Sequence, residues 1–180
     1  MKNLKVTTTI LAMAFLGFSA SCKENRKDVE SNAMVMTTQQ SSQAKMVLAD
    51  YMTLKDALVS DDSKAAATAA KQLEGSLAKF NVDDFKAEQQ AELKKTIADA
   101  KEHAEHISNS DISHQREHFK SLSLAIMDMV AITGTETTLY QQFCPMYDRG
   151  SAWLSMSKDI KNPYYGSKML TCGTVKKEIN

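Results

Sequence analysis

The sequence predicts an all-α fold: an up-down four-helix bundle with a C-terminal irregular cap that contains short strands. Three observations support this fold class. Residues 44–134 carry apolar side chains at helical spacing, interrupted at short intervals by polar turn sequences. Both prolines and the only tryptophan follow residue 134, where β-favouring residues are frequent. Four helices joined by short links pack naturally as an up-down bundle.

The N-terminus predicts export to the cell envelope. Residues 1–5 include two lysines, and residues 6–20 form an apolar stretch shorter than the roughly 20 residues of a membrane span. Small residues precede Cys22, as in the signal sequences of bacterial lipoproteins. We therefore expect a signal peptide over residues 1–21 and a lipid anchor on Cys22, on the periplasmic side or at the outer membrane. The alternative is an ordinary secretory signal that leaves Cys22 an unmodified thiol.

A polar tether and one folded domain follow the anchor. Residues 22–43 show no sustained apolar period, which is typical of a flexible linker. Order is expected from Ala44. Within residues 44–134, which form the helical bundle, apolar stripes predict four helices, over 47–58, 66–80, 93–107 and 112–130.

Polar and glycine residues mark the helix ends. Asp61 and Asp62 provide a turn and an N-cap before the second stripe. The run that ends at Asp111 closes the third helix and starts the fourth, and Gly134 suits the position after the last helix. These signals set the bounds of the four predicted helices.

Residues 135–180 are expected to form a cap packed on the bundle, as part of the same domain. Short strands are predicted at 135–143, 153–156 and 169–175. The aromatic side chains of this segment should bury against the helices, namely Trp153, Tyr164 and Tyr165.

The charge balance argues against nucleic-acid binding. Lys plus Arg and Asp plus Glu each number 22, and no basic cluster appears in the sequence. Phosphate binding needs a basic excess or a basic face. We therefore expect no nucleic-acid partner.

Cysteine and methionine residues form the candidate site. Cys144 and Met146 project to the same side of an extended segment, and Met169 and Cys172 can converge in a turn. Two thiolates and two thioethers favour Cu(I) or Ag(I) over hard cations. His118, at the margin of its helix's apolar face, can replace one sulfur. These five residues are the predicted metal ligands, and Cu(I) is the predicted ion.

His114 and His118 are spaced four apart, which allows a helix to chelate a metal, although His114 points further outward, as does His106.

A second interpretation of the cysteines is a disulfide. Cys144 and Cys172 would close a loop that stabilises the fold by roughly 3.5 kcal/mol. Residue chemistry alone slightly favours this bond, which would make the protein an interaction module without metal.

Enzymatic activity is not expected. A thiol oxidoreductase would need Cys-x-x-Cys, but the sequence has Cys144-Pro-Met-Tyr. A cysteine hydrolase would need His118 beside Cys144 in a cleft.

Several strings resemble a family of small bacterial envelope lipoproteins of unknown function. They are QFCPM at 142–146, GSAWLS at 150–155, IKNPYYG at 160–166, MLTCG at 169–173, YMTLKDALV at 51–59 and REHF at 116–119. The same domain is appended to periplasmic adaptor subunits of copper/silver efflux systems of the RND type. Tyr147 and Lys161 depart from the expected pattern.

The resemblance implies metal handling, and it shifts the balance from the disulfide towards a soft-metal site. The expected function is sequestration of Cu(I) or Ag(I), or its transfer to an efflux system. Besides the membrane, the implied partner is an efflux adaptor or a metal chaperone.

Overall fold

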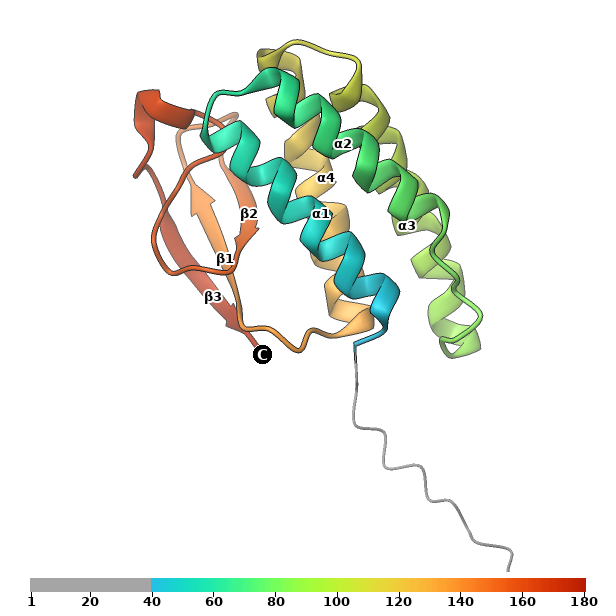
Figure 1. Cartoon of the computed structure of the whole chain (residues 1–180). Coiled ribbons are helices and arrows are strands. Elements are labelled where there is room, and N and C mark those ends of the chain that lie inside the picture. Colours follow the sequence, from blue (N-terminus) through green and yellow to red (C-terminus); the bar gives the residue numbers. More distant parts are fainter. Residues whose placement is uncertain (1–39) are drawn as a thin grey trace, which may run out of the picture. The chain divides into compact units, whose positions relative to one another are not determined.

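Four consecutive helices precede a small antiparallel sheet in residues 40–180, the part of the chain that the computed structural model describes (Figure 1). The predicted signal peptide and Cys22 lie outside these residues. The elements are α1 (Ser42–Val59), α2 (Ser63–Ala78), α3 (Ala87–Ser108), α4 (Ile112–Thr133), β1 (Leu139–Cys144), β2 (Ser151–Ser155), the 3-10 helix η1 (Gly166–Met169) and β3 (Thr174–Ile179).

Each helix packs against the next one in the chain, and α4 also contacts α1 and α2. The caps predicted from the sequence are present. The Asp62 carboxylate accepts a hydrogen bond from the Ala65 N–H, and the Asp111 carboxylate accepts from the N–H groups of Ser113 and His114. Order begins slightly earlier than Ala44, because α1 starts at Ser42. The four predicted helices are confirmed.

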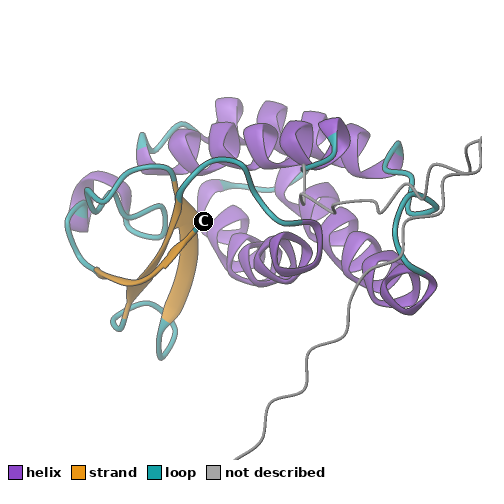
Figure 2. Cartoon of the chain, turned by 90° about the horizontal axis from the view of Figure 1, so that it is seen from below, coloured by secondary structure: helices purple, strands orange, loops and turns teal. Residues whose placement is uncertain are grey.

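The sheet lies to one side of the helices (Figure 2) and has the strand order β2-β1-β3. Both neighbours of β1 are antiparallel to it, with Cys144 opposite Ser151 on β2. Strand β2 supplies the contact with α4 and buries Trp153 and Leu154 completely. The chain therefore combines helices with a sheet that belongs to the same hydrophobic core.

The last strand lies later in the chain than the sequence predicts. Residues 166–169 form η1, and β3 begins only at Thr174. Gly173 separates the two with a φ of +152°, a conformation that residues with a side chain rarely adopt. Residues 169–175, despite their β-favouring composition, therefore form a turn followed by the start of a strand.

A buried hydroxyl pair joins the helices to the sheet. The Tyr51 phenol on α1 forms a hydrogen bond of 2.8 Å with the Ser123 hydroxyl on α4, and it accepts the N–H of Leu154 on β2 at 3.1 Å. Tyr51 is completely buried, and its ring stacks on Phe119. This contact fixes the position of β2, and through β2 that of β1 and Cys144.

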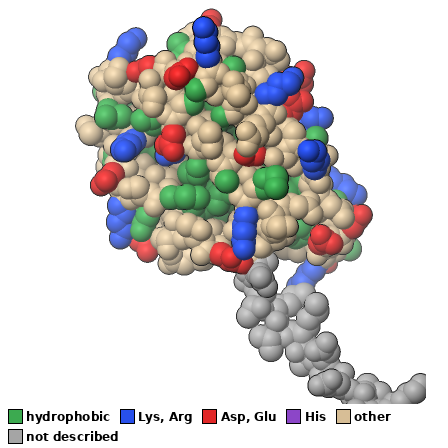
Figure 3. Space-filling model, in the orientation of Figure 1, with side chains coloured by type: hydrophobic (Ala, Val, Ile, Leu, Met, Phe, Trp, Pro, Cys, Tyr) green, Lys and Arg blue, Asp and Glu red, His purple; other side chains and the backbone are tan. Residues whose placement is uncertain are grey.

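Acidic and basic side chains are interspersed on the face shown in Figure 3. This distribution agrees with the balanced composition. None of the helices within residues 40–180 has the length and apolar character needed to cross a membrane.

Candidate functional site

Two cysteines from different parts of the cap meet at the end of the central strand. Cys144 is the last residue of β1, and Cys172 follows η1 after a turn in which its N–H donates to the carbonyl of Met169. Their Sγ atoms are 2.8 Å apart, and both cysteines are free thiols. Cys144 is completely buried and Cys172 is half-buried. The structure thus brings together the two predicted cysteine ligands.

Gly173 allows the turn that carries Cys172 to lie close to the sheet, because a Cβ atom at this position would lie 2.9 Å from the Trp153 ring. Asn162 then holds the turn that carries Cys172. Its side-chain amide donates to the carbonyl of Cys172 at 2.7 Å, and its N–H donates to the carbonyl of Leu170 at 2.8 Å. Asn162 is completely buried. Its role was missed by sequence reasoning, although an Asn that precedes a proline is a known turn signal.

Hydrogen-bond donors converge on the sulfur of Cys144. Burial raises the pKa of this thiol, but the Cys172 thiol and the N–H groups of Met146 and Tyr147 outweigh burial and lower the pKa of Cys144 below its usual value. The side chain of Asn162 acts in the same direction. Thiolate, not thiol, is the form that binds metals and attacks disulfides.

Cys172 has the opposite tendency. The hydrogen bond to Cys144 raises the pKa of Cys172, and burial and the negative charge on the neighbouring sulfur raise it further. The two pKa shifts are opposite: Cys144 loses its proton more readily than Cys172, whose thiol proton can be shared in the hydrogen bond. Such a pair can share an ion once Cys172 loses that proton, or it can be oxidised to a disulfide.

Both predicted methionine ligands lie in the turns beside the cysteines. The carbonyl of Met146 accepts the Tyr165 hydroxyl at 3.0 Å, and the carbonyl of Met169 accepts the Cys172 N–H. Their side chains are exposed, by 62% for Met146 and 38% for Met169. The structure thus fixes the backbone of both residues while their thioethers face solvent.

The fifth predicted ligand, His118, lies among other histidines. Its Nδ1 is 3.1 Å from Nδ1 of His103 on α3, and its Nε2 is 3.1 Å from Nε2 of His114. The ring of His106 stacks on it with a centroid distance of 4.3 Å. His103 and His106 were missed as site residues, because the period of one helix does not show which residues its neighbour presents.

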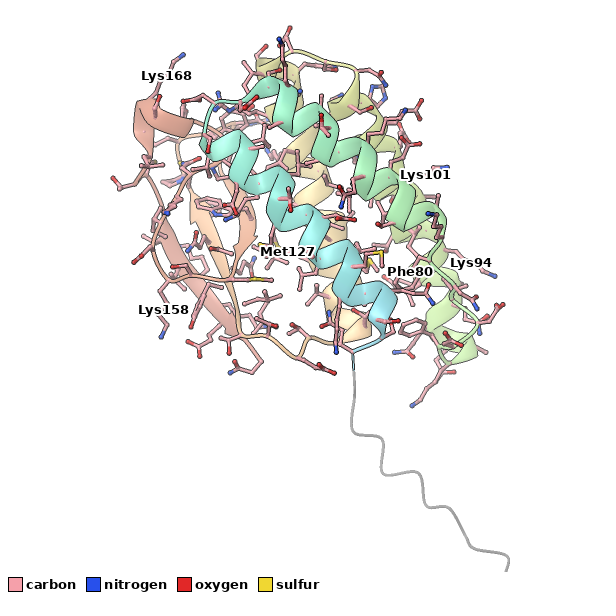
Figure 4. All side chains as sticks on the ribbon, viewed as in Figure 1. Phe80, Lys94, Lys101, Met127, Lys158 and Lys168 are labelled. Carbon is pink, nitrogen blue, oxygen red and sulfur yellow. The ribbon has the colours of Figure 1, made fainter. Side chains whose placement is uncertain are left out.

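The cysteine pair and the histidines occupy different regions of the fold. The cysteines belong to the sheet and its turns, whereas the histidines lie on α3 and α4. In Figure 4, Lys168 marks η1, which precedes Cys172 in the chain, and Lys101 marks α3, which carries His103 and His106. His118 therefore belongs to a second cluster.

Comparison with protein families gives a match. Residues 47–138, about half of the chain, match a family described as a protein of unknown function, DUF3347. The chain belongs to the DUF3347 family. The matched region contains α2, α3, α4 and most of α1, and it ends just before β1. The four histidines lie within the DUF3347 region, and Cys144 and Cys172 lie beyond it. Neither the curated proteins nor the solved structures contain a match.

Proposed function

We propose that the protein is a lipid-anchored envelope protein that binds a soft monovalent ion, Cu(I) or Ag(I), through Cys144 and Cys172. The observation that carries the proposal is the 2.8 Å separation of the two sulfur atoms, together with the donors that stabilise a thiolate at Cys144. Thiolate and thioether ligands favour Cu(I) over hard cations, and a thioether is a poor ligand for Zn²⁺. The helices, arranged as an up-down bundle, serve as the platform for this site.

A shared ion requires a small movement of the sulfur atoms. With a metal–sulfur bond of about 2.3 Å, two sulfurs of a tetrahedral site lie about 3.8 Å apart, and further apart at lower coordination numbers. Cys172 can supply this movement, because it is half-buried and lies in a turn. Met146 and Met169 can then complete the site by rotation of their exposed side chains.

The direct test is a titration of the reduced full chain with Cu(I) under anaerobic conditions, in competition with a chelator of known affinity. We expect tight binding that is lost in the Cys144→Ser/Cys172→Ser variant. Met146→Leu and Met169→Leu should weaken binding, whereas Met156→Leu, which changes another exposed methionine, should not. Binding that persists in the double cysteine variant would contradict the proposal.

The predicted role in the cell is sequestration of the ion or its transfer to an efflux system. The lipid anchor on Cys22 would hold the protein at the membrane, where an efflux adaptor or a metal chaperone can reach it. Cell fractionation of a Cys22→Ala variant tests the anchor: we expect the protein to move from the membrane fraction to the soluble fraction.

A disulfide is the second candidate, and the same short sulfur–sulfur distance favours it. The bond would close a loop between residues 28 positions apart, and the protein would then act as an interaction module without metal. Mass spectrometry of the intact protein, alkylated before and after reduction, distinguishes the two functions. Two cysteines protected from alkylation until reduction would establish the disulfide and exclude a thiolate site in the isolated protein.

A further inference from the structure

All four histidines of the chain gather in one place. His103 and His106 come from the C-terminal part of α3, and His114 and His118 come from the first two turns of α4. A nitrogen from each of His106, His114 and His118 lies within 4.8 Å of the corresponding nitrogens of the other two. His103 contacts His118 from the opposite edge of its ring.

Helix geometry explains the convergence. His103 and His106 are three residues apart, and His114 and His118 are four apart, so each pair occupies one face of its helix. Helices α3 and α4 pack against each other and are joined by only three residues, 109–111. The two faces therefore meet next to the connection.

Glu117 determines which nitrogen of His114 can bind a metal. Its carboxylate lies 2.8 Å from Nδ1 of His114 and accepts a hydrogen bond from the N–H group at that position. Nε2 of His114 is then unprotonated, and its lone pair points towards His118. A carboxylate behind a histidine in this way fixes the tautomer and raises the basicity of the metal-binding nitrogen.

The surroundings of His118 favour the neutral form of its imidazole. Burial lowers the pKa of His118, and the neighbouring His106, His114 and His103 lower it further. Glu117 opposes these effects. A neutral imidazole keeps a lone pair, and this is the form that coordinates metals.

We propose that His106, His114 and His118 bind a divalent transition-metal ion, with His103 and Glu117 as positioning residues. Imidazole ligands suit Zn²⁺, Cu²⁺, Ni²⁺ and Co²⁺, and exclude hard ions such as Mg²⁺ and Ca²⁺. In a tetrahedral zinc site with bonds of about 2.05 Å, neighbouring nitrogens are about 3.3 Å apart. The Nε2 atoms of His114 and His118 are 3.1 Å apart, close to this value.

Metal binding requires two local adjustments. The ring of His106 now stacks on that of His118 with an interplanar angle of 7°, so it must rotate to direct a nitrogen at the ion. His106 is exposed and can do so. In addition, Nδ1 of His118 must carry the proton and donate a hydrogen bond to Nδ1 of His103, so that Nε2 of His118 is free to bind the ion. Three imidazoles leave the fourth position of a tetrahedral ion to water.

This proposal is independent of the Cu(I) function, because the two sites share no ligand. Co²⁺ is the first probe, because its absorption spectrum reports the ligands. Full-length protein is titrated with Co²⁺ in the Cys144→Ser/Cys172→Ser background. We expect the ligand-field bands of a low-symmetry site, without the thiolate charge-transfer band. Absence of these bands at saturating Co²⁺ would overturn the proposal.

Single His106→Gln, His114→Gln and His118→Gln variants identify the ligands. Each should weaken Co²⁺ or Zn²⁺ binding by more than 10-fold. Removing the positioning residues, in Glu117→Ala and His103→Ala, should weaken it by about 10- to 100-fold. Unchanged affinity in the His114→Gln and His118→Gln variants would overturn the assignment.

Thermal unfolding of the same variants without metal is the control for folding. Zn²⁺ should raise the melting temperature of the parent protein, because an ion that binds only the folded state stabilises it. The histidine variants should lose this rise while they keep the metal-free melting temperature. A full rise in a His114→Gln/His118→Gln variant would place the zinc elsewhere and contradict the proposal.

Discussion

The carboxylate of Asp61 accepts a hydrogen bond from the guanidinium of Arg116 at 2.5 Å, which joins the α1–α2 turn to α4. The same carboxylate accepts the N–H of Ser167 in η1 at 2.9 Å. Arg116 also donates to the carbonyls of Leu58 and Pro163, each at 2.9 Å. One ion pair therefore holds α1, α4 and the turn segment before Cys172 together.

Arg116→Ala should destabilise the protein strongly. The side chain of Arg116 is only 10% exposed, and its loss leaves Asp61 and two carbonyl groups without their main donor. Water can solvate Asp61, whose side chain is 35% exposed, so the main cost comes from the two buried carbonyl groups, at about 1–3 kcal/mol for each unsatisfied group. Urea unfolding followed by the fluorescence of Trp153, the single tryptophan, measures the loss. The control Lys158→Ala removes an exposed ion pair with Glu178 and should change little. Equal effects of the two variants would contradict this prediction.

Gly166→Ala should disrupt the same contact sterically. Gly166 has a φ of +56°, and a Cβ atom there would collide with the carboxylate of Asp61 and the guanidinium of Arg116. The left-handed conformation alone costs a residue with a side chain roughly 1–2 kcal/mol. The control is Gly75→Ala within α2, where a Cβ atom meets nothing within 4 Å. This control should stabilise the helix by about 0.5–1 kcal/mol. A Gly166→Ala variant as stable as the parent would contradict the steric argument.

The Asp61 contact should also make stability depend on acidity. The Ser167 hydroxyl, the Arg116 guanidinium and the Ser167 N–H hold the pKa of Asp61 well below its usual 3.8. A depressed pKa in the folded state means that this contribution is complete above the unfolded pKa and declines as the pH falls below about 4. Unfolding free energies measured from pH 7 to pH 2.5 should show this decline. Asp61→Asn should be less stable than the parent at pH 7, and the difference should shrink in acid. A constant difference would contradict the assignment.

Tyr51→Phe should weaken the junction between helices and sheet. The substitution leaves the Ser123 hydroxyl and the Leu154 N–H without their buried partner. An unsatisfied buried polar group costs about 1–3 kcal/mol. Ser123→Ala tests the same contact from α4, and the double variant should lose less than the sum of the two single losses. Additive losses would mean that the two hydroxyls act independently.

The helices were predictable because their signals are local. Apolar side chains at helical spacing defined α1 to α4, and the N-caps Asp62 and Asp111 were readable from residue type. The cap was harder. Residues 169–175 have β-favouring composition, but the positive φ of Gly173 and the turn held by Asn162 delay the start of the strand to Thr174. Turn geometry of this kind depends on tertiary hydrogen bonds that no local pattern records.

In the candidate sites, too, some features could be predicted from local sequence and others depend on tertiary packing. The cysteines could be paired from the sequence because Cys144 and Cys172 are the two cysteines that follow the tether. The partners of His118 could not, because convergence of His103 and His106 on it depends on the rotation of α3 relative to α4. Neither the lipid anchor nor the ion bound by the protein is tested by the fold, and both stay predictions.

The sheet order makes β3 an edge strand, which among residues 40–180 pairs only with β1. Nearly all of its side chains are exposed. An exposed edge can pair with a strand of another molecule, which leads to aggregation. Lys176 and Lys177 lie in the middle of β3, and the ammonium group of Lys176 lies 5.3 Å from the centroid of the Phe143 ring. Their charges make strand pairing between two copies unfavourable. These lysines thereby protect the open edge of the sheet against aggregation.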